Sequence, residues 1–177
     1  MIRMGKIIFC FMAVGLFMMH PANPAFAKNK FEKEVEKEQA GVKLVREVQR
    51  GGYDVITAKE LKDMIDSGKN TLIIDTMPYD ASYRKAHIPG AEQFLFPIPE
   101  MESWDTKETG GKTIDDYKAL LGSDMSKTIV VYCGFVKCTR SHNGAMWATK
   151  LGYKNVLRFP GGIFAWKGAK YPTEKVK

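Results

Sequence analysis

The sequence predicts an α/β protein, with a central, mostly parallel sheet of about five strands and helices on both faces. Two observations predict this fold. Short runs of β-branched and aromatic residues, at 72–75 and 128–132, are typical of buried parallel strands. Helical patterns separate such runs, and a strand–helix–strand order requires a right-handed crossover in a parallel sheet.

The first 27 residues are expected to be a secretory signal peptide. Arg3 and Lys6 give a positive start, residues 7–19 are apolar, and Ala27 closes an A-x-A cleavage site. The alternative is an uncleaved anchor, although the apolar run is shorter than the roughly 20 residues of a full span. We therefore expect an exported, periplasmic or otherwise extracytoplasmic protein that meets the membrane only through this segment if it stays uncleaved.

Residues 28–52 form a highly charged extension with helical spacing, before a boundary at Gly51-Gly52. We favour a helix laid across the domain or a spacer, and a partner-binding arm is the alternative. Its apolar positions fall on one helical stripe: Phe31, Val35, Val42 and Val45.

The main domain is expected over residues 53–177 and begins with a short strand. Thr57 and Glu60 then form a capping box at the start of a helix. The remaining elements are the strand at 72–75, a helix after Thr113, the strands at 128–132 and 155–159, and a final helix anchored by Trp166.

Cys133 follows the strand at 128–132 and is the candidate nucleophile. Ser141 is expected to be the N-cap of the next helix, which runs to Leu151. Thiols react as thiolates, and loop amides at a helix N-terminus favour an anion. Together with Lys137 and Arg140, they should favour Cys133 as a thiolate, or an anion bonded to it.

Four motifs in this order make the sequence resemble the rhodanese family. They are His87-Ile88-Pro89-Gly90-Ala91, Tyr132-Cys133 with its loop, Leu151-Gly152-Tyr153, and Gly161-Gly162 followed by Trp166. The resemblance runs from about Tyr53 to Pro172. It implies a three-layer rhodanese-like fold and a persulfide on Cys133. It also implies a substrate-binding loop, composed of Gly134, Phe135, Val136, Lys137, Cys138, Thr139 and Arg140.

The implied function is a sulfurtransferase that passes sulfur from a small anionic donor, thiosulfate or a polysulfide, to a thiol, cyanide or a protein. One alternative is a non-catalytic sulfur carrier or redox-sensing module for a partner protein. The other is a phosphatase or arsenate reductase. Related phosphatases place five residues between Cys and Arg, whereas six lie between Cys133 and Arg140.

Cys138 is a second thiol in the same loop, five positions after Cys133. It is either a resolving thiol or the partner in a disulfide, or it is simply buried. One cysteine pair falls short of four metal ligands, so we expect no metal, and no cofactor is implied. The net charge of +7 comes from basic residues interleaved with acidic ones, which argues against a nucleic-acid partner.

Asp75 ends a buried strand close to where Cys133 should lie. It either contributes indirectly to the site or simply accepts hydrogen bonds from loop amides. Met77 and Ser82 stand where the family usually has an Arg–Glu pair. We interpret His87 as structural, with a hydrogen bond to the backbone.

Overall fold

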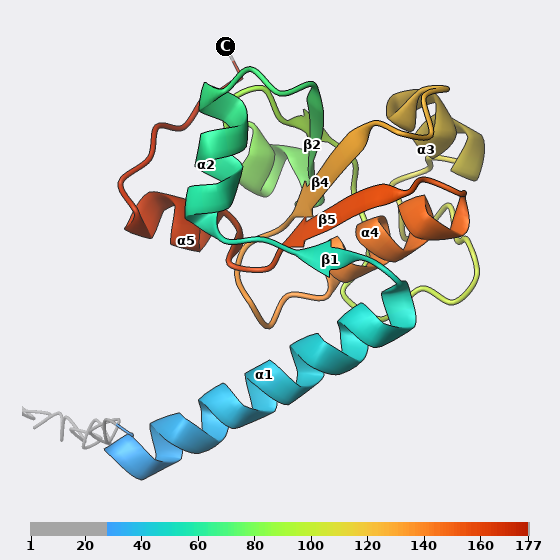
Figure 1. Cartoon of the computed structure of the whole chain (residues 1–177). Coiled ribbons are helices and arrows are strands. Elements are labelled where there is room, and N and C mark those ends of the chain that lie inside the picture. The colour runs from blue at the N-terminus through green and yellow to red at the C-terminus, as the bar shows by residue number, and fades with distance from the viewer. Residues whose placement is uncertain (1–27, 177) are drawn as a thin grey trace, which may run out of the picture.

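The computed structural model describes residues 28–176 as a five-stranded sheet between two layers of helices (Figure 1). The strands are β1 (Asp54–Val55), β2 (Thr71–Asp75), β3 (Glu92–Gln93), β4 (Thr128–Tyr132) and β5 (Asn155–Phe159). The helices are α1 (Lys30–Gly51), α2 (Ala58–Asp66), α3 (Ile114–Leu121), α4 (Arg140–Lys150) and α5 (Gly162–Gly168), together with one π-helical turn, η1 (Tyr79–Tyr83).

The strand order is β1-β5-β4-β2-β3, and every neighbouring pair is parallel. The register aligns Asp75 with Tyr132, and Tyr132 with Phe159. Because the three central strands end side by side, the residues that follow them share one edge of the sheet. The fold class expected from the sequence is confirmed.

The central strand β4 is buried on both faces, which explains its continuous apolar sequence. Ile129 and Val131 pack into a core with α3 and α4, whereas Val130 and Tyr132 pack into a second core with α2 and α5. The first core holds a group of aromatic rings. Phe96 is fully buried there and Trp104 packs against it edge to face, so both belong to the core.

Most predicted helix boundaries are confirmed by the cap geometry. Thr57 and Thr113 both form capping boxes. The N-cap predicted at Ser141 is wrong, because α4 begins at Arg140 and its N-cap, Thr139, makes no side-chain capping bond. Ser141 instead lies inside the first turn with its hydroxyl buried, where it meets other partners.

The helix α1 is continuous through Gly41 and contacts the domain along α4. It runs outward from the domain at its N-terminal end (Figure 1). Its apolar stripe is exposed, with Phe31 72% and Val35 51% accessible. The charged helix expected here is therefore present, but its buried face is a different one from the apolar stripe.

The expected signal peptide, with Cys10 inside it, lies outside the described residues. Between residues 28 and 176, no helix has both the length and the apolar character needed to span a membrane.

Gly162 makes the tightest approach to the loop after β4. Its φ of +57° is in the left-handed region, and an added Cβ would lie 2.2 Å from the carbonyl oxygen of Cys133. The carbonyl cannot move freely because it accepts a hydrogen bond from Ile163 N–H at 2.9 Å. Only glycine fits this position.

We expect Gly162→Ala to lower the free energy of unfolding by about 2 kcal/mol or more, through backbone strain and the clash. Urea denaturation measures this directly. Gly168→Ala is the matched control, because Gly168 lies in the same helix and an added Cβ would meet nothing within 4 Å. Equal stability of the two variants would contradict the predicted close packing.

Candidate active site

Cys133 lies directly after β4, at the base of a loop formed by residues 134–139. Neighbouring strands and helices hold this base in place. Thr76 donates to the carbonyl of Tyr132 from its amide at 3.0 Å and from its hydroxyl at 2.8 Å. On the other side, Phe164 N–H donates to the carbonyl of Gly134 at 3.0 Å. The position of Cys133 is thus set by β2, β4 and α5 together.

The Cys133 thiol is fully buried among polar groups. Its Sγ lies 3.2 Å from the Ser141 hydroxyl and 3.3 Å from the carbonyl oxygen of Cys138, to which it donates. Burial raises the pKa of Cys133 well above its ordinary value, and a hydrogen bond with Cys138 adds to this, while the Ser141 hydroxyl and amide oppose it.

Cys138 has the opposite electrostatic environment. Cys138 is 8% exposed, and in the described part of the chain both cysteines are free thiols. The pKa of Cys138 is lowered to about 6, chiefly by a hydrogen bond from the Cys133 thiol and then by the amides of Arg140 and Gly134. For the resting pair, the directions of the two pKa shifts run against the expectation that the loop would favour the thiolate at Cys133. Within this coupled pair the negative charge is favoured on Cys138, first because the Cys133 side chain lowers its pKa and then because Cys138 is less deeply buried.

The other loop residues divide into a buried and an exposed group. Gly134 and Thr139 are buried, and Arg140 is half-buried with its guanidinium donating to the carbonyl of Phe96. The Arg140 guanidinium is therefore bound by a backbone carbonyl outside the loop. The exposed side chains at the tip of the loop are Phe135, Val136 and Lys137.

Asp75 is buried at the end of β2 and stabilises the turn that follows it. One carboxylate oxygen accepts a hydrogen bond from the Met77 amide at 2.8 Å, and the other has no hydrogen-bond partner among residues 28–176. Burial raises the pKa of Asp75 to about 6. The Met77 side chain approaches Gly134, so an apolar contact occupies the place where the family usually has an arginine. His87 is structural as predicted, with Nδ1 2.9 Å from the carbonyl of Tyr83.

Arg158 is the main residue of the site that the sequence did not reveal. It lies on β5 and is fully buried. Its Nε donates to the Ser141 hydroxyl and its Nη2 to the Cys138 carbonyl, both at 2.9 Å. Its Nη1 pairs with the carboxylate of Glu47 on α1 at 2.5 Å. One guanidinium thus connects α1 to two of the groups that contact the Cys133 sulfur, the Ser141 hydroxyl and the Cys138 carbonyl.

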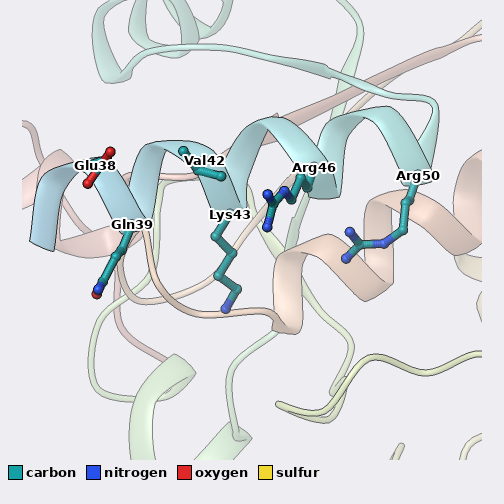
Figure 2. A pocket seen from close by; sticks show the side chains of 6 residues that line it. All are labelled: Glu38, Gln39, Val42, Lys43, Arg46 and Arg50. Carbon is teal, nitrogen blue, oxygen red and sulfur yellow. The ribbon is translucent and has the colours of Figure 1, made fainter. Parts of the chain in front are cut away.

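Helix α1 also reaches the loop through Lys43. The Lys43 ammonium donates to the Thr139 hydroxyl at 2.9 Å and to the carbonyl of Lys137 at 3.1 Å. Lys43, Arg46 and Arg50 occupy successive turns of α1, and Lys43 points toward the loop that leads into α4 (Figure 2). They line a shallow pocket along the helix.

The cysteine lies at the carboxyl edge of the sheet, at the start of a loop that leads into α4. A comparison with known protein families assigns this arrangement to one of them. The model of the rhodanese-like domain matches residues 57–169. The chain belongs to the rhodanese family. Helix α1, with Lys43 and Glu47, precedes the matched region. None of the curated proteins matches the sequence.

Several solved structures share this rhodanese fold. A thiosulfate sulfurtransferase from Pseudomonas aeruginosa matches with a TM-score of 0.56 and 21% identity, over 78% of this chain and 23% of that one. A polysulfide-sulfur transferase homodimer from Wolinella succinogenes matches with a TM-score of 0.51 and 14% identity, over 82% and 90% of the two chains. A protein of unknown function from Rhodopseudomonas palustris, described as a possible tyrosine phosphatase, matches with a TM-score of 0.51 and 25% identity, over 76% and 93%.

We expect iodoacetamide at pH 7 to modify Cys138 of this rhodanese before Cys133, because Cys138 is the more exposed thiol and ionises first. Its rate of modification should fall as the pH is lowered through about 6, where the thiol becomes protonated. Peptide mass mapping at limiting reagent identifies the modified residue.

The Cys138→Ser variant is the control, because it retains only the slowly reacting Cys133 in the described part of the chain. Preferential labelling of Cys133 in the unmodified protein would show that the loop ionises in the opposite order.

Proposed function

We propose that this protein is a sulfurtransferase. It moves sulfane sulfur from an anionic donor, thiosulfate or a polysulfide, through a persulfide on Cys133 to a thiol, cyanide or protein acceptor. The observation that supports this most is a pair of free, buried thiols in one loop of a rhodanese-family chain. The loop lies at the carboxyl edge of a parallel sheet, where α/β proteins usually bind ligands.

The proposed first step uses both thiols. The sulfur of Cys133 attacks the outer sulfur of thiosulfate, the donor S–S bond breaks, and sulfite leaves with the bonding electron pair. The proton of the Cys133 thiol passes to Cys138, the neighbouring thiol whose pKa is lowered. A thiolate or cyanide acceptor then attacks the terminal sulfur, and Cys133 leaves as a thiolate.

The loop provides the binding site for the anionic donor. Backbone amides from Gly134 to Arg140 stabilise the anionic sulfur in the way that an oxyanion hole does. Lys137 is exposed at the loop tip and attracts the donor. Arg140 contributes its amide, since its guanidinium is bound to Phe96.

We further propose that Cys138 makes the site sensitive to oxidation. A Cys133–Cys138 disulfide would block persulfide formation until a thiol reductant opens it. Such control suits an exported protein, which we infer from the signal peptide expected to be cleaved near Ala27.

A sulfur carrier for a partner protein is the second candidate. It is supported by the complete burial of Cys133 and by apolar side chains around the loop, where Phe135 is 46% and Phe164 64% exposed. Their rings lie 5.5 Å apart. A carrier should load sulfur once and turn over thiosulfate and cyanide poorly, whereas an enzyme should turn over repeatedly.

Phosphatase or arsenate-reductase chemistry is the third candidate, and the arginine of the loop argues against it. A phosphate cradle needs its arginine directed at the anion. The guanidinium of Arg140 instead binds the carbonyl of Phe96.

We expect the reduced protein to gain one sulfur atom after treatment with thiosulfate or a polysulfide, as measured by intact mass. Cys133→Ala should abolish the gain, because it removes the proposed sulfur-carrying residue. Cys138→Ser should still load, more slowly at neutral pH because the proton acceptor is missing. Omitting the reductant shows whether a disulfide blocks the site.

Loading of Cys133→Ala to the level of the unmodified protein would overturn the proposed role of Cys133. Absence of loading in the reduced, unmodified protein would overturn sulfur transfer itself, and phosphate and arsenate assays would follow.

A further inference from the structure

The active-site loop is tied to a helix that lies outside the matched rhodanese-like domain. Helix α1 ends at Gly51, and the family match begins at residue 57. Glu47 on this helix is 1% exposed, although most charged side chains of α1 point into solvent. A carboxylate this buried needs a compensating partner, and Arg158 provides it at 2.5 Å.

Arg158 uses every nitrogen of its guanidinium within the protein. Besides Glu47, it donates to the Ser141 hydroxyl, the Cys138 carbonyl and, at 3.2 Å, the Tyr53 hydroxyl. Because these groups come from two distant parts of the chain, the end of α1 with Tyr53 and the junction of the loop with α4, the planar guanidinium fixes their relative positions. Glu47 in turn fixes the guanidinium.

The bond from Arg158 to Ser141 also leaves the hydrogen of the serine hydroxyl available for another partner. Since Ser141 Oγ accepts from Arg158 Nε, its own hydrogen is free to point at the Cys133 sulfur, 3.2 Å away. A donor aimed at this sulfur favours the thiolate, which burial otherwise disfavours.

We infer that Glu47 is a positioning residue for sulfur transfer. By holding Arg158, it keeps the Ser141 hydroxyl aimed at the Cys133 sulfur and the Cys138 carbonyl in place. The α1 extension is therefore part of the active site. The role of Glu47 in catalysis rests on the proposed sulfurtransferase function. The effect of Glu47 on the ionisation of the Cys133 thiol can be tested independently of that function.

Several other ionisable groups surround the loop, and the test has to separate Glu47 from them. Lys43 lies 3.5 Å from Glu47 and shares the salt bridge. The remaining groups are Asp75 at the end of β2, Glu100, Cys138 and Arg140 on loop segments or helix ends, Tyr53 before β1, and His142 on α4.

The test compares Glu47→Gln with Glu38→Gln in the full protein. Both lie on α1 and lose one carboxylate charge, but Glu38 is exposed. We expect Glu47→Gln to shift the pH profile of sulfur loading upward by about one unit, which slows loading about tenfold at neutral pH. The rates should converge at high pH, where Cys133 ionises without help. Glu38→Gln should match the unmodified protein.

A second readout needs no sulfur chemistry. In a Cys138→Ser background, iodoacetamide reports the ionisation of the Cys133 thiol directly, and Glu47→Gln should move its pH profile upward by the same amount. If the unmodified protein loads no sulfur but this shift appears, the proposed function fails and the positioning role stands.

A structural role alone would lower the melting temperature of Glu47→Gln and leave both pH profiles unchanged, and this result would overturn the inference. If Glu47→Gln does not fold, Glu47→Asp is measured in the same way, because it retains the charge but shortens the side chain. A smaller upward shift then supports positioning, and an unchanged profile overturns it.

Discussion

The buried ion pair between Glu47 and Arg158 is the interaction on which the rest of the site depends. Breaking a buried pair by removing one partner costs about 3–5 kcal/mol, because the other charge stays uncompensated. The pair is also surrounded by hydrogen bonds, so the desolvation penalty is offset by several partners at once. Two hydrophobic residues of similar size would give stability, but they could not orient Ser141 or hold the Cys138 carbonyl.

The two thiols are best understood as a single titrating unit. Cys133 is at the buried base of the loop and Cys138 is nearer its surface, so a single negative charge is most stable on the outer sulfur. A nucleophile that is protonated at rest is compatible with sulfur transfer when its proton acceptor lies within hydrogen-bond distance.

The fold was largely predictable because its signals are local. The strand at 155–159 and the capping boxes at Thr57 and Thr113 depend on residues within one or two turns of each other. The ion pair was not predictable in this way, since Glu47 and Arg158 are 111 positions apart. Arg158 did leave one signal, because a charged residue inside a buried strand pattern needs a buried partner. The lowered pKa of Cys138 could not be predicted from the sequence either, because it depends on which of the two sulfurs is more deeply buried in the folded loop.

The two halves of helix α1 differ in what surrounds them. Its C-terminal half contributes Lys43 and Glu47 to the loop, whereas its N-terminal half is exposed and carries Phe31 and Val35 on its surface. The helix is unbroken, with a capping box at Asn29 and a left-handed cap at Gly52. If Glu47 positions the site as we infer, the environment of the Cys133 sulfur depends on how α1 lies against α4, and α1 precedes the matched residues 57–169.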